Sequence, residues 1–197
     1  MICKKEDTSL CQNCIQKLPK ATFLEDPWMH SLFSYQDTRV RKIVHALKFN
    51  HTRSIANHLG LHLHDLIQNT LSDKIKLNEN NLITLLPVPR MQSHLNARGC
   101  DAILALCESV KAQDNNQYGI EKTSVIRVNT KAQVGLSRQA RLLNMKDAFR
   151  VVDKDALNNK IICIIDDVIT TGSTLRELRK VCLEGGAKEV FAVTIAH

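Results

Sequence analysis

The feature that most constrains the fold is an uninterrupted apolar run at residues 161–165, which ends in two adjacent carboxylates. The run contains four isoleucines and one cysteine and shows no polar alternation. That pattern is typical of a central strand in a parallel sheet that is covered on both faces. Asp166 and Asp167 should therefore lie at the carboxyl end of the strand, where open α/β sheets bind their ligands.

A loop of small residues and a helix follow the acid pair. Apolar residues recur at helical spacing from Leu175 to Cys182, and Gly185 with Gly186 marks the helix end. A second strand is predicted over residues 190–195. Unpaired amides at a helix start bind phosphate without a lysine, and paired carboxylates accept hydrogen bonds from a vicinal diol. We therefore expect Asp166 and Asp167 on a ribose diol. The phosphate should lie on the loop residues Thr170, Thr171, Gly172, Ser173 and Thr174.

The same segment has two other interpretations. In the first, it is an ordinary strand-to-helix turn in which Asp166 and Asp167 are solvated caps. In the second, it is a P-loop, which requires a lysine after the final glycine. Ser173 follows Gly172, so the P-loop is excluded.

Residues 164–174 resemble the phosphoribosyl pyrophosphate loop of type I phosphoribosyltransferases. The resemblance implies an α/β fold with a Rossmann-like parallel sheet flanked by helices. It also implies that Asp166 and Asp167 contact the ribose and that Mg²⁺ binds with the pyrophosphate. Purine-salvage members of the hypoxanthine type carry an aspartate as general base at the position of Thr170. This chain lacks that acid.

A second strand and loop are predicted upstream. Residues 82–86 form an apolar strand that ends in Pro87, Val88, Pro89 and Arg90, and residues 101–110 form the helix after it. The resemblance to phosphoribosyltransferases implies that this loop binds pyrophosphate, through backbone amides near Val88 to Met91 and the Arg90 guanidinium. The alternative is a proline-rigidified turn with Arg90 in solvent.

A basic segment lies between residues 129 and 150. Arg138 and Arg141 share one face of a predicted helix and could form a lid that closes over the pyrophosphate and excludes water during catalysis. An ordinary solvated basic helix explains the same residues equally well.

The amino-terminal cysteines favour a small metal site. Cys3, Cys11 and Cys14 include a C-x2-C knuckle of the kind that binds tetrahedral zinc. His30, or a residue upstream of Met1, would complete the set. The alternative is a reduced, unstructured tail. We therefore divide the chain into a cysteine-rich, zinc-ribbon-like segment (residues 1–35) and a phosphoribosyltransferase domain (residues 36–197).

Two helical stripes are predicted at residues 40–47 and 55–67, and five of the aromatic residues fall between positions 23 and 49. Aromatics interleaved with basic residues could stack single-stranded bases, although core packing is the favoured interpretation. His58 and His62, with Asp65 a turn further on, could chelate a metal. A solvated helix face is favoured for them because no third ligand is evident.

Composition adds weaker constraints. The net charge of +7 suits a polyanionic partner, and the odd number of cysteines, seven, indicates reduced thiols rather than a disulfide framework. No apolar run approaches the ~20 residues of a membrane helix, and the start is unlike a secretory signal. We therefore expect a cytoplasmic protein.

The order of motifs along the whole chain resembles the ComF family of competence phosphoribosyltransferase-like proteins. The shared motifs are the cysteine knuckle, residues 46–49, 86–89, 98–99 and 133–138, Asn144, residues 148–149 and the acid-pair loop. The chain departs from the family at residues 100–102, where Cys-Asp-Ala replaces Phe-Asn-Gln, and in its incomplete first knuckle.

The ComF resemblance implies a role in natural transformation. The expected protein binds phosphoribosyl pyrophosphate with Mg²⁺ and assists uptake or processing of single-stranded DNA, with or without transferase activity on an unidentified acceptor. Its expected partners are DNA, the cytoplasmic competence machinery and inner-membrane DNA translocation proteins. The alternatives are a nucleobase salvage phosphoribosyltransferase and a non-catalytic module that senses phosphoribosyl pyrophosphate and binds single-stranded DNA.

Overall fold

A five-stranded parallel sheet forms the centre of the protein, with strand order β1-β7-β6-β2-β3. The structure, a computed structural model, describes residues 10–22, 24–49, 52–76, 82–90, 101–114, 116–128 and 147–197. The sheet strands are β1 (Met29–Phe33), β2 (Ile83–Pro87), β3 (Tyr118–Ile120), β6 (Ile161–Val168) and β7 (Glu189–Ala196). The helices are α1 (Gln12–Gln16), α2 (Thr38–Phe49), α3 (Thr52–Lys76), α5 (Ala102–Lys111) and α7 (Ser173–Glu184).

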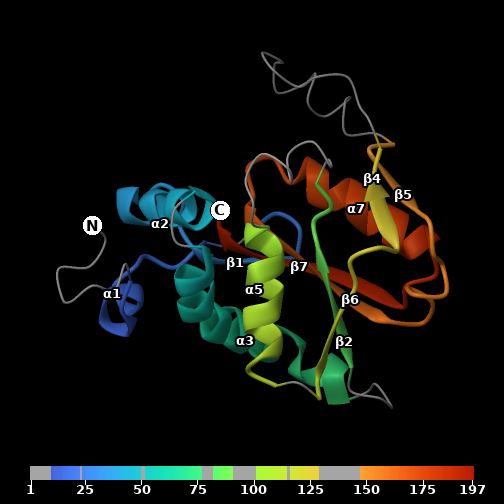
Figure 1. The fold of residues 1–197 in the computed structure, drawn as a ribbon, viewed down its shortest axis with the longest axis horizontal. Helices are drawn as coiled ribbons and strands as arrows, with labels where there is room; N and C mark the ends of the chain where they lie inside the picture. Colours follow the sequence, from blue (N-terminus) through green and yellow to red (C-terminus); the bar gives the residue numbers. More distant parts are fainter. Residues whose placement is uncertain are drawn as a thin grey trace.

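β6 is the central strand, hydrogen-bonded to β2 on one side and β7 on the other. Its alternate residues enter two separate cores. Ile161, Cys163 and Ile165 pack under α2, α3 and α5, whereas Ile162 and Ile164 pack under α7. Figure 1 shows α3 and α5 side by side, with α7 separated from them by the sheet. The predicted two-sided burial of this strand is therefore confirmed.

The fold class predicted from the sequence is confirmed as an α/β fold with a parallel sheet flanked by helices. The elements expected at residues 82–86, 101–110 and 190–195 are β2, α5 and β7, and the two helical stripes are α2 and α3. No helix in the described ranges is both long and apolar enough to cross a membrane.

Two parts of the architecture were not predicted. β1 pairs in parallel with β7, so the sheet includes residues on the amino-terminal side of the expected boundary at residue 35. A separate antiparallel ribbon joins β4 (Val125–Arg127) to β5 (Phe149–Val151). These strands are three to five residues long and carry polar side chains, so they lack the apolar run that identified β6.

The aromatic residues of the amino-terminal third serve mainly in packing, which is the interpretation favoured from the sequence. Phe33 is fully buried, and Trp28 and Tyr35 pack against the cores. The Arg179 guanidinium lies 4.9 Å from the Trp28 ring centroid, a cation–π contact that holds the segment before β1 against α7.

The contact between α3 and α5 depends on a glycine. A Cβ atom added at Gly60 would lie 2.9 Å from the backbone carbonyl carbon of Ser109 and would also collide with the Ser109 side chain. Because Ser109 is itself buried in α5, the obstruction includes backbone that cannot rotate away. Gly60 therefore sets the closest approach of the two helices.

Gly60→Ala should destabilise the protein by about 1–3 kcal/mol, because overpacking outweighs the roughly 1 kcal/mol gain in helix propensity. Gly119→Ala is the matched control, since its added Cβ would have no neighbour nearer than 4.0 Å. Denaturant unfolding of both variants measures the difference. Equal stability of the two would show that α3 and α5 can separate at no cost.

Candidate functional site

The two acids predicted to bind ribose lie near the carboxyl end of β6 and are still part of the sheet. Asp166 is aligned with Thr194 of β7, and Val168 with Ala196. Successive side chains of a strand point to opposite faces. The Asp167 side chain is therefore on the face covered by α2, α3 and α5, and Asp166 is on the α7 face.

Asp167 is buried and paired with two cations. Its carboxylate Oδ2 lies 2.8 Å from the Lys48 Nζ at the end of α2 and 3.6 Å from the nearest Arg90 guanidinium nitrogen, after β2. Only 7% of the residue is exposed. Three segments that are distant in the sequence thus meet at one carboxylate, at the edge of the sheet where ligand binding was predicted.

Asp166 has a different environment. One of its carboxylate oxygens accepts a hydrogen bond from the Asp167 amide at 2.9 Å. Burial, and to a lesser degree repulsion by Asp167, raises the pKa of Asp166 to about 7, against the opposing effects of the amide, Arg90 and Lys48. Near neutral pH, Asp166 is therefore divided between a proton donor and a charged acceptor.

Arg127 of the β4–β5 ribbon also belongs to this region. Burial lowers the pKa of Arg127, and the charge of Asp166 opposes that effect. The ring centroid of Phe149 lies 5.7 Å from the Arg127 guanidinium, so the ribbon fixes this cation by a cation–π contact across its two strands. The ribbon was not predicted, and it brings a third basic residue to the acid pair.

The loop between β6 and α7 offers backbone amides. Among the residues that the structure describes, no protein acceptor contacts the amides of Thr170, Thr171, Gly172 or Thr174. The Ser173 amide makes one long bond of 3.4 Å to the Thr171 hydroxyl. Gly172 has a φ of 72°, a left-handed conformation that favours glycine. Donors of this kind at the positive end of a helix are what the predicted phosphate site requires, and phosphate binding at this loop stays a prediction.

The segment before β1 holds this loop in place. Arg176 donates to the Thr171 carbonyl at 2.9 Å and forms an ion pair with Asp26 at 2.6 Å. A Cβ at Gly172 would lie 3.2 Å from the Met29 methyl carbon, so Met29 closes the space behind the loop. The phosphate loop is thus anchored by residues that lie far upstream in the sequence.

The loop after β2, which was predicted to bind pyrophosphate, has fewer available backbone amides than expected. The Val88 amide donates to the Ile165 carbonyl at 3.1 Å, because the β2–β6 pairing continues past the end of β2. That amide is not available to pyrophosphate, and Pro89 has no N–H. The Val88 amide is therefore not one of the predicted pyrophosphate donors, and pyrophosphate binding by the rest of the loop stays a prediction. Arg90 is the remaining described candidate of this loop, and it contacts Asp167 rather than lying free in solvent.

Several predicted site residues lie outside the described ranges, namely Cys3, Met91, Arg138 and Arg141. Cys11 precedes α1, and Cys14 lies within it; the Cys14 amide donates to the Cys11 carbonyl at 3.0 Å. His30 is on β1. Within the described ranges no three histidine, cysteine or acidic side chains converge as a metal site. Zinc binding stays a prediction.

Asp101 explains one departure from the family pattern. Its side chain caps α5 by accepting hydrogen bonds from the amides of Ile103 and Leu104, at 3.0 and 3.2 Å. Aspartate and asparagine both serve well as helix N-caps. The replacement of asparagine at this position therefore preserves the start of the helix.

Sequence reasoning missed several site residues, among them Lys48, Asp26 and Arg127. Lys48 directly follows the apolar stripe predicted at residues 40–47, and no local pattern predicts its contact with Asp167. Asp26 carried no motif at all. Neither ion pair could be inferred locally, because each partner lies more than a hundred positions away in the sequence.

Comparison with known proteins finds relatives among DNA utilization and competence proteins. No protein-family model matches the chain. DNA utilization protein YhgH of Escherichia coli (strain K12) is 29% identical over 183 residues, covering 91% of this chain and 74% of that protein. Competence protein F of Haemophilus influenzae is 41% identical over 63 residues, covering 32% of this chain and 28% of that protein. The predicted resemblance to the ComF family is confirmed by these relatives.

Solved structures give weaker alignments. An L. donovani hypoxanthine-guanine phosphoribosyltransferase aligns over 72% of this chain and 71% of its own, at 16% identity and a TM-score of 0.44. An allosteric regulatory enzyme of purine biosynthesis aligns over 73% of this chain and 25% of its own, at 19% identity and a TM-score of 0.41. Scores at this level carry no argument about function, and the fold is assigned from the sheet itself.

The raised pKa of Asp166 predicts a pH-dependent cost in stability. Native Asp166 keeps its proton between pH values of about 4 and 7, whereas the unfolded chain releases it at the lower value. Stability should therefore fall as pH rises through this range. The Asp166→Asn variant has no carboxyl group to titrate at this position. The difference in unfolding free energy between the variant and the wild type should therefore shift in favour of the variant by roughly 2–4 kcal/mol from about pH 4 to pH 8.

Denaturant unfolding at a series of pH values measures this difference. Asp155→Asn, on the exposed surface, is the control and should follow the wild-type curve. A constant offset between Asp166→Asn and the wild type would show that Asp166 is ionised in the native protein throughout.

Proposed function

We propose that this protein is a ComF-like competence protein that binds phosphoribosyl pyrophosphate with Mg²⁺ and assists the uptake or processing of single-stranded DNA. The observation that carries the proposal is that an acid pair at one edge of a parallel sheet is followed by a loop in which four amides have no acceptor among the described residues. A diol and a monophosphate are the groups that these donors and acceptors recognise together. The similarity to DNA utilization and competence proteins supplies the cellular context.

The charges around the acid pair suit a ligand with more than one anionic group. Lys48, Arg90 and Arg127 supply three positive charges against the two carboxylates. The amides of the loop would bind the 5′-phosphate, and the cations of the opposite side would face the pyrophosphate. Magnesium usually keeps several waters and takes one or two carboxylates together with phosphate oxygens. Asp166, which is not held by an ion pair, fits as its protein ligand.

If the protein is catalytic, its reaction would be displacement at the ribose C1′ with pyrophosphate as the leaving group. Positioning and charge neutralisation would lower the barrier. Arg138 and Arg141 remain the proposed lid over the pyrophosphate. The exposed Thr170 offers no acid or base to a purine, which disfavours the salvage alternative. The acceptor would instead be bound by residues other than the acid pair or by a partner protein.

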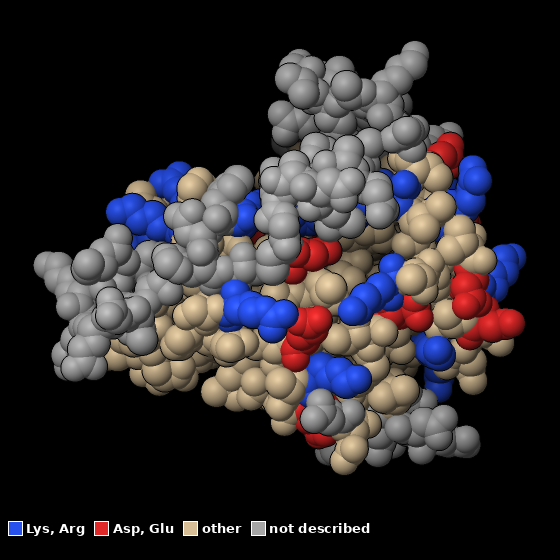
Figure 2. Space-filling model, viewed as in Figure 1, with Lys and Arg blue, Asp and Glu red and all other residues tan. Residues whose placement is uncertain are grey.

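Contact with DNA would use the basic surface of the amino-terminal half. Arg39, Arg41 and Lys42 are exposed on α2. Figure 2 shows Lys and Arg side chains gathered over this helix. Exposed cations suit the phosphates of a single strand, and of these three Arg39 is also paired with Asp37 at 2.7 Å. The cytoplasmic competence machinery and the inner-membrane DNA translocation proteins are the partners proposed to deliver that strand.

Asp166→Asn combined with Asp167→Asn should weaken phosphoribosyl pyrophosphate binding by about 100-fold or more, because the diol loses the Asp167 carboxylate and Mg²⁺ loses the Asp166 carboxylate. Titration calorimetry with Mg²⁺ measures the affinity, and circular dichroism checks the fold. Asp166→Asn alone carries the test if the double variant is unstable, and Asp155→Asn is the control. Unchanged affinity would overturn the assignment of the site.

The same variants test the cellular role. In a naturally competent host that lacks its own ComF-like protein, this chain and Asp155→Asn should restore transformation, and the double variant should not. Full restoration by a double variant that no longer binds phosphoribosyl pyrophosphate would separate DNA uptake from ligand binding.

We also propose that Cys3, Cys11 and Cys14 hold a structural zinc ion, with His30 or a further residue as the fourth ligand. Cys11→Ser with Cys14→Ser should abolish zinc that co-purifies with the protein, because two of the thiolates are removed. Elemental analysis measures the metal. Cys163→Ala, which changes a thiol buried in the core, should keep it. Equal zinc in all three proteins would place the metal elsewhere.

A further inference from the structure

The inference concerns the two cations that share Asp167, and it rests on the proposed function. Lys48 and Arg90 approach the same carboxylate oxygen, at 2.8 and 3.6 Å. All three side chains are withdrawn from solvent, with exposed fractions of 29% for Lys48, 19% for Arg90 and 10% for Asp167. Two positive charges therefore share one carboxylate oxygen in a partly buried place.

This arrangement restricts what can bind at Asp167. A sugar diol that takes the carboxylate as its hydrogen-bond acceptor competes directly with the Lys48 ammonium group. A neutral diol brings no charge in exchange, so Lys48 and Arg90 would be left in a partly buried site with a weakened counter-ion. Leaving buried charges unpaired is strongly unfavourable. A ligand that also carries an anion next to the diol avoids this penalty, because the anion replaces Asp167 as their partner.

We propose that Lys48, together with Arg90, is a specificity-determining residue that selects sugar phosphates with a second anionic group beside the ribose diol. Binding exchanges one set of contacts for another. The diol takes the Asp167 carboxylate, and the Lys48 ammonium moves to the incoming anion. Phosphoribosyl pyrophosphate can make this exchange. Ribose 5-phosphate, which has the diol and the 5′-phosphate alone, cannot.

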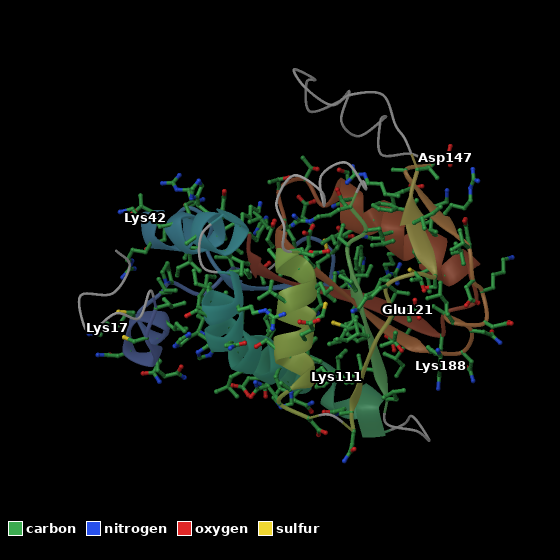
Figure 3. The ribbon with its side chains drawn as sticks, viewed as in Figure 1. Lys17, Lys42, Lys111, Glu121, Asp147 and Lys188 are labelled. Atoms are coloured by element: carbon green, nitrogen blue, oxygen red, sulfur yellow. The ribbon has the colours of Figure 1, made fainter. Side chains whose placement is uncertain are left out.

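Lys48 is well placed for such a movement. It is the penultimate residue of α2, at the end that reaches the sheet edge, and its flexible side chain can follow an anion without moving the helix. Lys42, earlier on the same helix, is exposed and lies on the outer surface of the molecule (Figure 3). Lys42 therefore offers a matched control with the same charge, helix and side chain.

The experiment compares phosphoribosyl pyrophosphate and ribose 5-phosphate by titration calorimetry with Mg²⁺ on the wild type, Lys48→Met, Lys48→Arg and Lys42→Met. The wild type should prefer phosphoribosyl pyrophosphate by at least about 30-fold. Lys48→Met should bind phosphoribosyl pyrophosphate at least about 10-fold more weakly and ribose 5-phosphate no more weakly than the wild type, so that the preference collapses. Lys48→Arg and Lys42→Met should keep the preference.

A merely structural role for Lys48 predicts a different result. If the ion pair only tethers α2, Lys48→Met would lower the affinity for both ligands by the same factor. This outcome overturns the inference. A wild type that binds both sugar phosphates with similar affinity overturns it without any variant. If the wild type binds neither phosphoribosyl pyrophosphate nor ribose 5-phosphate, the proposed function itself is overturned. If Lys48→Met still prefers phosphoribosyl pyrophosphate, only the proposed exchange of Lys48 from Asp167 to the ligand anion is overturned.

Discussion

The burial of β6 on both faces is the constraint on which the rest of the structure depends. The strand is hydrogen-bonded to neighbours on both sides and is covered by α2, α3 and α5 above and α7 below. An aliphatic strand in this position has no solvated face, so polar residues can follow only where the covering layers diverge. Asp166 and Asp167 lie at that point. The position of the site is thus a direct consequence of the position of the core.

The pairing of β6 with β7 through residue 168 also separates the functions of the two acids. Because the strand stays regular, the side chains of Asp166 and Asp167 point to different faces. Asp167 forms ion pairs with Lys48 and Arg90, whereas burial and the neighbouring Asp167 raise the pKa of Asp166. One sequence motif therefore creates two chemically different carboxylates.

The sequence allowed prediction of those parts that have a strong local signal. The isoleucine run, the stripe from Leu175 to Cys182 and the glycine pair defined β6 and α7, and the acid pair and its loop followed from them. β1 and the β4–β5 ribbon are short and mixed in polarity, so their pairing depends on partners that no local pattern reveals. The same limit applies to Lys48 and Asp26, whose roles arise only when distant segments meet. The Val88 amide was misjudged because the length of the β2–β6 ladder is fixed by its partner strand.

The conformation of the loop between β6 and α7 depends on residues that are far away in the sequence. The loop sequence explains its amides and the left-handed Gly172, yet the conformation is held from behind by Met29 and by the Arg176–Asp26 ion pair. Asp26 precedes β1 and Met29 is its first residue, and β1 joins the sheet by pairing with β7, the last strand along the chain. Contacts between segments so far apart in the sequence carry a loop-closure entropy cost that the packing of β1 must offset. The conformation of this loop therefore depends on the position of β1 at the edge of the sheet.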